Sequence, residues 1–206
     1  MLTIWGRLNS HNVKKVAWAA QEIGLAHQRI DIGGKFGFTP QYLALNPNRL
    51  IPTIEDANVP GGFVLWESNA ILRYLAAAHA PHLWPESAQA QGSADRWMDW
   101  QFQYADAQRD AFLGLVRHAP ENRDAAAIAR SAEKCGALME ILDAQLARQP
   151  WLTGAHFGIA DMPMGVYAYT YFGIDIPRPD LPHVGAWYAR LTQRPGFASQ
   201  VMIPLS

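Results

Sequence analysis

The sequence predicts an α/β domain followed by an all-helical domain. Over the first 80 residues, short apolar runs alternate with apolar residues at helical spacing, in the order βαβαββα. The next segment holds Pro81 and Pro85 among small polar residues, which is typical of a linker. After it the strand signals largely vanish and long helical patterns remain. We therefore assign residues 1–80 to the α/β domain, 81–87 to the linker and 88–206 to the helical bundle.

Each element of the first domain has its own local signal. Apolar runs predict the four strands of a mixed sheet, at residues 2–5, 28–32, 51–55 and 63–66. Helical spacing predicts a first helix over residues 13–23, ended by Gly24. A second helix starts with Thr39 as its cap and Pro40 at the first helical position, where proline is favoured, and it ends at Asn46-Pro47. A third helix follows Ser68, which is expected to cap it.

Four long helical patterns make up the second domain, separated by prolines. They run roughly over residues 88–117, 123–148, 158–172 and 182–193. Near the start of the third, Asp161 can accept a hydrogen bond from the backbone N–H of Gly158, as the acid of a capping box does. This capping bond is sufficient to explain an aspartate at this position, so we interpret Asp161 as structural.

Composition excludes several classes of function. The chain has 17 Lys+Arg against 18 Asp+Glu, a net charge of −1 and no basic run, which argues against nucleic-acid or membrane-surface binding. No apolar stretch is long enough to span a membrane. Cys135 is the only cysteine and the seven histidines lack ligand spacing, so we expect neither a disulfide framework nor a metal site. The prediction is a soluble, cytoplasmic protein.

A first candidate site lies between the first strand and the first helix, at Asn9-Ser10-His11-Asn12. Free backbone N–H groups and the helix dipole favour an anion there. One interpretation is that Ser10 or Asn12 only caps the helix. The alternative is that Ser10 donates a hydrogen bond to a bound anion such as a thiolate.

Two further candidate stretches lie in separate loops. Ile51-Pro52 opens the third strand, where proline is structurally allowed. Glu67-Ser68 precedes a helix, so backbone N–H groups suited to a carboxylate lie beside a carboxylate suited to an ammonium. Together these groups match an amino-acid zwitterion, although an ordinary helix cap beside a solvated glutamate has the same sequence.

Four stretches in register resemble the soluble glutathione transferases: Asn9-Ser10-His11-Asn12-Val13, Ile51-Pro52-Thr53, Glu67-Ser68-Asn69-Ala70-Ile71 and Ile159-Ala160-Asp161. The resemblance covers essentially the whole chain. Its Ser-x-Asn-Val pattern is similar to the serine-type bacterial members related to the theta and nu classes. The resemblance implies a thioredoxin-like first domain and a helical C-terminal domain.

The resemblance also implies catalytic residues. Ser10 matches the hydroxyl that faces the glutathione sulfur, and Asn12 matches the amide that assists it. Both would stabilise the thiolate, which is the nucleophilic form of a thiol that is mostly protonated at neutral pH.

Four further residues match the family's glutathione-binding positions. Ile51 matches the residue whose backbone pairs with the cysteinyl unit, before a cis-proline at Pro52. Glu67 and Ser68 match the pair that holds the γ-glutamyl ammonium and carboxylate. Glutathione would then be a co-substrate, and no metal is implied.

The implied activity is transfer of glutathione to a small hydrophobic electrophile, as in detoxification. Two alternatives stay open: a glutathione-dependent peroxidase or disulfide-bond reductase, and a non-catalytic glutathione-binding protein. The family precedent and the aromatic load of the first long helix, at Trp97, Trp100 and Tyr104, predict a homodimer.

The chain departs from the family pattern at three places. Leu50 stands where many relatives offer Lys or Gln to glutathione, so the glycyl carboxylate needs another partner, such as Lys35, Arg49 or water. Gly158 replaces the usual Ser or Thr at a helix cap, at a cost of a few tenths of a kcal/mol. No cysteine lies near position 10, which argues against a glutaredoxin-like or omega-like thiol mechanism, because Cys135 falls within a helical segment and is expected to be inert core.

Overall fold

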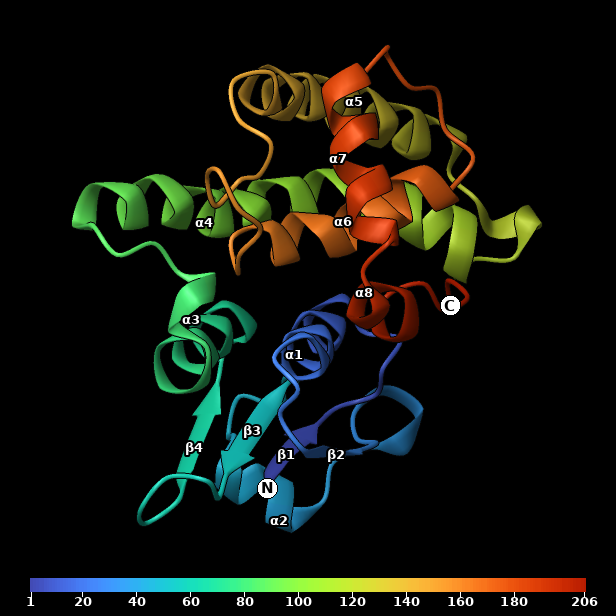
Figure 1. The fold of residues 1–206 in the computed structure, drawn as a ribbon. Coiled ribbons are helices and arrows are strands. Elements are labelled where there is room, and N and C mark those ends of the chain that lie inside the picture. Colours follow the sequence, from blue (N-terminus) through green and yellow to red (C-terminus); the bar gives the residue numbers. More distant parts are fainter. The chain divides into compact units, whose positions relative to one another are not determined.

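The computed structural model describes residues 1–206, which form two compact units. The first comprises Met1–Trp84 with Pro195–Ile203, and the second comprises Pro85–Arg194 with Pro204–Ser206. The predicted order βαβαββα is confirmed in the first unit (Figure 1). Its elements are β1 (Leu2–Trp5), α1 (His11–Glu22), β2 (His27–Ile30), α2 (Pro40–Leu45), β3 (Thr53–Asp56), β4 (Phe63–Trp66) and α3 (Ser68–His79), followed by α8 (Pro195–Gln200).

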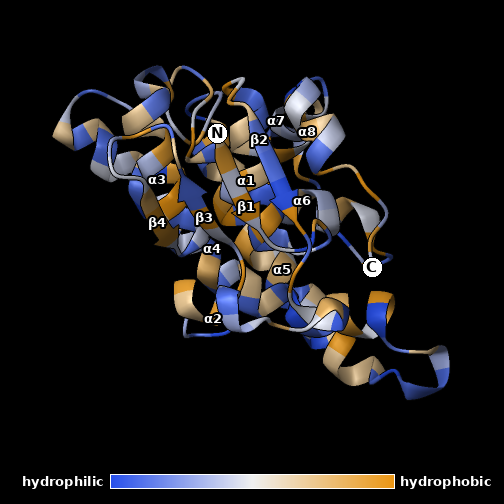
Figure 2. Ribbon diagram, turned by 90° about the horizontal axis from the view of Figure 1, so that it is seen from below, coloured by the Kyte–Doolittle hydropathy of each residue, from blue (hydrophilic) through white to orange (hydrophobic).

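The four strands form the mixed sheet that the sequence predicts, in the order β2-β1-β3-β4. β1 pairs in parallel with β2, and β3 pairs antiparallel with both β1 and β4, with Ile4 opposite Ile54. Figure 2 shows β1 in hydrophobic colours and β2 largely in hydrophilic ones. The two central strands, β1 and β3, are accordingly mostly buried, whereas β2 and β4 are the edges of the sheet.

Helices cover both faces of the sheet. Successive side chains of a strand point to opposite faces, so β1 contributes side chains to both. Ile4 and Ile54 are fully buried, and α1 packs against both β1 and α3. Trp5 points to the other face, where its ring lies 5.8 Å from that of Tyr42 in α2. Thr39 caps α2 as predicted, since its hydroxyl accepts a hydrogen bond from the Tyr42 N–H at 3.2 Å.

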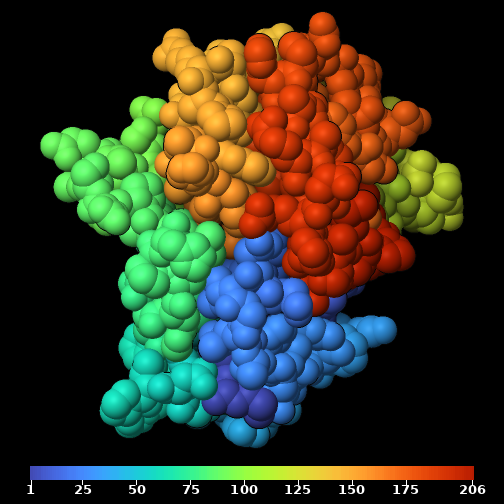
Figure 3. All heavy atoms as spheres, in the orientation of Figure 1, coloured from blue at the N-terminus to red at the C-terminus, as the bar shows by residue number.

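The last helix, α8, packs against α1 within the first unit, and Figure 3 shows these two segments of the chain side by side on the surface. The Phe197 ring meets Trp18 edge-on at 4.9 Å, and Lys14 Nζ donates to the Val201 carbonyl at 3.0 Å. Residues Pro195–Ile203 therefore group with the first unit, whereas the sequence placed them in the helical domain.

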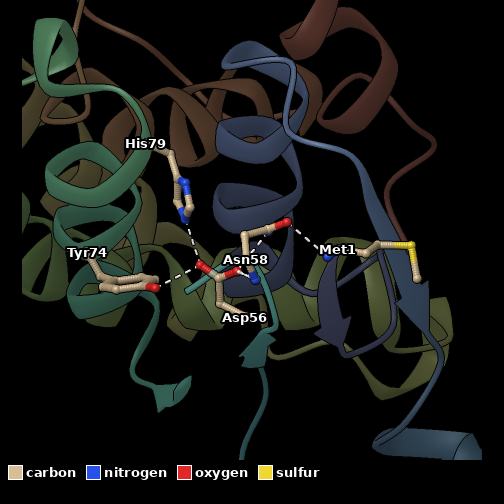
Figure 4. A network of polar contacts seen from close by, with 5 residues as sticks. All are labelled: Met1, Asp56, Asn58, Tyr74 and His79. Atoms are coloured by element: carbon tan, nitrogen blue, oxygen red, sulfur yellow. Dashed lines mark hydrogen bonds and ion pairs between the residues drawn. The ribbon is translucent and has the colours of Figure 1, made fainter. Parts of the chain in front are cut away.

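A buried carboxylate, Asp56 at the end of β3, fastens that strand to α3 (Figure 4). It accepts hydrogen bonds from Tyr74 Oη at 2.7 Å, from His79 Nε2 at 2.6 Å and from Asn58, whose own side chain holds the Met1 ammonium at 2.9 Å. Burial opposes ionisation, but the hydrogen bonds outweigh it and lower the pKa of Asp56 to about 2. This network is structural and joins the N-terminus to the sheet.

The second unit is helical, as predicted. It consists of α4 (Ala88–Phe112), α5 (Ala125–Leu146), α6 (Asp161–Gly173) and α7 (Pro182–Thr192). The first predicted helix, 88–117, is α4 followed by one π-helical turn over Leu113–Arg117. Cys135 in α5 is fully buried, and burial raises the pKa of its thiol to about 11, so it is not a reactive thiol.

Asp161 confirms its predicted structural role, although α6 begins at Asp161 itself and not at Gly158. Its Oδ2 accepts from the Gly158 N–H at 3.2 Å, which is the predicted bond. The same carboxylate also accepts from Leu152 N, from Thr153 N and Oγ1, and from Trp187 Nε1. One side chain thus ties the loop before α6 to α7.

No helix has the length and apolar composition needed to cross a membrane. No three His, Cys, Asp or Glu side chains converge in a way that could hold a metal ion.

Candidate functional site

The first side of the candidate site is the N-terminus of α1. Ser10 is the N-cap residue, and its carbonyl accepts the first helical bond from Lys14 N at 2.9 Å. Its hydroxyl makes no capping hydrogen bond and is partly exposed. The simple capping interpretation is therefore wrong for the Ser10 side chain, which stays available at a position that favours an anion.

The second side is the loop that leads into β3. The Ile51-Pro52 peptide bond is cis, as the resemblance implied. Asn46 is buried beneath this loop, and its Nδ2 donates to the Leu50 carbonyl and to Thr53 Oγ1, both at 3.1 Å. Tyr42 Oη donates to the same Leu50 carbonyl.

These bracing residues were missed in the sequence, where Asn46-Pro47 read only as the end of a helix. A buried amide that crosses a loop leaves no periodic signal.

The third side is the N-terminus of α3, where one expectation needs correction. Ser68 does not cap this helix: it is the first helical residue, and Glu67 occupies the cap position with a φ of 73°. Ser68 is buried at 3% exposure, and its hydroxyl donates to Asn12 Oδ1 at 3.3 Å. The Glu67 side chain is exposed and makes no capping bond, so neither side chain caps the helix.

A buried lysine lies beneath these groups and was also missed. Lys15 is fully buried, and its Nζ donates to Ser68 Oγ at 3.3 Å and to Asn69 Oδ1 at 3.2 Å. Burial lowers the pKa of its amine to about 7, against the opposing effect of the Glu67 carboxylate. A lysine in an amphipathic pattern is normally read as solvent-exposed, which is why the sequence did not reveal it.

A small cavity brings most of the predicted residues together. Five of the six line it: Asn12, Ile51, Pro52, Glu67 and Ser68, joined by Asn46, Asn48 and Leu50. Ser10 does not line this cavity. Its walls carry one carboxylate, one hydroxyl and three amides, with the Lys15 amine behind Ser68. This donor and acceptor set suits a zwitterion better than an apolar ligand.

The two positions considered for a third contact lie on the surface. Lys35 and Arg49 are exposed, and neither lines the cavity. Leu50 does line it and is 61% exposed, so the rim of the cavity is apolar at this position.

The first unit is thus a thioredoxin-like fold with a cis-proline loop, a hydroxyl without a capping bond at one helix N-terminus and an acid at another, and the second unit is helical. Residues 9–78 match the profile "Glutathione S-transferase, N-terminal domain" and residues 125–190 match "Glutathione S-transferase, C-terminal domain". The chain belongs to the glutathione S-transferase family, which confirms the resemblance seen in the sequence.

Individual relatives match over nine-tenths or more of both chains. Glutathione S-transferase GstB of Escherichia coli is 42% identical over 210 residues, with full coverage of both chains. The theta class glutathione S-transferase of Xanthomonas axonopodis pv. citri, solved with glutathione bound, is 48% identical with a TM-score of 0.94, covering 100% of this chain and 99% of that one. The disulfide-bond oxidoreductase YfcG of Escherichia coli is 30% identical, covering 93% of this chain and 90% of its own. The chain is thus a glutathione S-transferase enzyme.

Proposed function

We propose that the enzyme binds glutathione in the cavity of the first unit and activates its thiol at Ser10 and Asn12 for attack on a small hydrophobic electrophile. The γ-glutamyl group meets Glu67 and the N-terminus of α3, and the cysteinyl backbone pairs with Ile51 before the cis Pro52. The glycyl carboxylate, without a polar residue at position 50, is met by Lys35, Arg49 or water.

The observation that carries this proposal is that the helix-terminal groups have spare hydrogen-bonding capacity. The Ser10 hydroxyl makes no capping bond, and Asn12 uses only its oxygen, as the acceptor of the Ser68 bond. The Asn12 nitrogen and the Ser10 hydroxyl are therefore both available as donors to a thiolate. Lowering a thiol pKa by about two units requires about 2.7 kcal/mol, which one or two charge-assisted hydrogen bonds can supply.

The chemistry needs no general base from the protein. The thiol proton leaves to solvent, the thiolate sulfur forms a bond to the electrophilic carbon, and the bond from that carbon to its leaving group breaks. Ser10 and Asn12 stabilise the sulfur anion before this step.

A second candidate activity is reduction of disulfides or peroxides with a second glutathione, favoured by the similarity to the disulfide-bond oxidoreductase. Conjugation of a chlorodinitrobenzene-type electrophile, measured beside disulfide and hydroperoxide reduction, separates the two. Fast reduction with negligible conjugation would reverse the ranking.

Replacing Ser10 with alanine is expected to slow conjugation at neutral pH by about tenfold, because the thiolate loses one of two donors while Asn12 keeps the other. Glutathione affinity should change less than turnover. The measurement is the ultraviolet absorbance of bound thiolate as a function of pH, beside turnover at saturating glutathione. Full thiolate absorbance in Ser10→Ala, with none in Asn12→Ala, would show that Ser10 is the wrong residue.

We further propose a cytoplasmic homodimer that acts in detoxification. The aromatic side chains of α4 no longer support a dimer, since Trp97 and Tyr104 are buried within the second unit. Support comes from the edge strand β4, where Phe63, Val64 and Trp66 are each about 40% exposed. An exposed apolar edge strand is typical of a surface that a second protein chain buries.

Light scattering is expected to give about twice the 22.9 kDa mass of one chain. The double variant Val64→Glu, Trp66→Glu should be monomeric, because it places charges on the apolar edge, whereas Met202→Glu, at an equally exposed apolar side chain, should stay dimeric. A wild-type mass near 23 kDa at micromolar concentration would reject the dimer.

A further inference from the structure

Lys15 donates to a chain of hydrogen bonds that ends at the proposed thiol site. Its Nζ donates to Ser68 Oγ at 3.3 Å, and Ser68 Oγ donates to Asn12 Oδ1 at 3.3 Å. Lys15 and Asn12 lie three residues apart on α1, and Ser68 belongs to α3. The chain of bonds therefore leaves α1, passes through the neighbouring helix and returns to α1 at its N-terminus.

We propose that Lys15 is a positioning residue, which through Ser68 turns the Asn12 carboxamide so that its nitrogen faces the glutathione sulfur. A hydroxyl has one proton to donate and can also accept. Because the Lys15 amine donates to the Ser68 oxygen, the Ser68 proton goes to the other polar group in reach, the Asn12 oxygen. The Asn12 amide then has its oxygen held towards α3 and its two N–H groups turned away from it.

The buried setting makes this orientation strong. Lys15 is 0% exposed and Ser68 is 3% exposed, so water does not compete effectively for either group. An amine keeps at least two N–H donors whether or not it is protonated, so it can serve both Ser68 and Asn69 in either state. Without the amine, the Ser68 oxygen could accept from the Asn12 nitrogen, and the carboxamide would be free to turn over.

The inference rests on the proposed role of Asn12. A double-mutant cycle separates the role of Lys15 from the role of Asn12. The measured quantity is the pKa of the bound glutathione thiol, from thiolate absorbance against pH at saturating glutathione. Lys15→Met is expected to raise this pKa and to lower conjugation at neutral pH by about fivefold. In an Asn12→Ala background the same change should have no further effect, because the group that Lys15 orients is gone.

Lys14→Met is the matched control. Lys14 is the neighbouring residue on α1, is also buried, and donates to the Val201 carbonyl next to α8. Its loss should lower stability as much as the loss of Lys15 while leaving the thiol pKa unchanged. If Lys15→Met does not fold, Ser68→Ala breaks the same chain of bonds with the loss of one oxygen, and should raise the thiol pKa in the wild-type background only.

Each outcome decides the matter. A thiol pKa that Asn12→Ala raises but Lys15→Met leaves unchanged would overturn the positioning role and leave the proposed function intact. An equal shift from Lys15→Met in both backgrounds would mean that the lysine acts by charge and not through Asn12, which also overturns it. No effect of Asn12→Ala would overturn the proposed role of Asn12 and the inference together.

Discussion

Replacing Asp161 with asparagine is expected to lower the free energy of unfolding by about 3–5 kcal/mol. The carboxylate is fully buried and accepts five hydrogen bonds, from Leu152 N, Thr153 N, Thr153 Oγ1, Gly158 N and Trp187 Nε1. An asparagine of the same shape turns one acceptor oxygen into an NH₂ group that faces other donors. At least one buried N–H group then loses its partner, and a repulsive contact replaces an attractive one.

Asp124→Asn is the matched control for this change. Asp124 caps α5 by accepting a single bond from Ala127 N at 2.9 Å, and it is exposed. Asparagine caps a helix about as well as aspartate, so its cost should stay under about 0.5 kcal/mol. Urea unfolding followed by circular dichroism measures both variants. A loss of under about 1 kcal/mol for Asp161→Asn would contradict the central role of this carboxylate.

Asp161 also shows what kind of site the sequence can reveal. Its bond to Gly158 spans three residues and follows from the local capping pattern, so it could be predicted. Its bond to Trp187 joins two helices that are distant in sequence, and no local pattern signals such a contact. The same division holds across the fold: strand 63–66 and the cap at Thr39 were predicted from local signals.

The burial of two lysines in α1 could not be predicted from the local sequence pattern. Apolar residues at positions 13, 16, 17 and 20 predict one buried face, which leaves Lys14 and Lys15 in solvent. In the structure both are buried, because α8 contacts α1 near Lys14 and the start of α3 contacts it at Lys15. When a helix is covered on more than one side, only tertiary contacts explain the burial of its polar residues. The hydrogen bonds from Lys15 to the candidate site are tertiary contacts of this kind.

Glu67 is misread from the sequence for a related reason. A capping serine is the ordinary interpretation of Glu67-Ser68, yet the structure gives the cap position to Glu67 at positive φ and turns the Ser68 hydroxyl towards α1. Positive φ is uncommon outside glycine and is found preferentially at functional sites. The local backbone thus supports a binding role for the pair, which the sequence could not separate from capping.

Removing the Glu67 carboxylate, by Glu67→Gln, is expected to weaken glutathione binding by about 1.5–3 kcal/mol, the range for hydrogen bonds to charged groups. The carboxylate is exposed in the free protein, where water screens it, so the lower part of this range is expected. The γ-glutamyl ammonium lies at the far end of glutathione from the sulfur, so its contacts are equal in the ground and transition states. Such uniform binding raises affinity without accelerating the chemical step, and turnover at saturating glutathione should stay within a few-fold.

The measurement is titration calorimetry with glutathione, beside steady-state kinetics. Glu55→Gln is the matched control: it removes the same charge from the same unit but does not line the cavity, and its amide oxygen can still accept from Trp5 Nε1. Ser68→Ala belongs to the same series, because Ser68 also lines the cavity, and its loss should lower glutathione affinity. If Glu67→Gln and Ser68→Ala both bind glutathione with unchanged affinity, the γ-glutamyl group is not recognised at this cavity, since no other acidic side chain lines it.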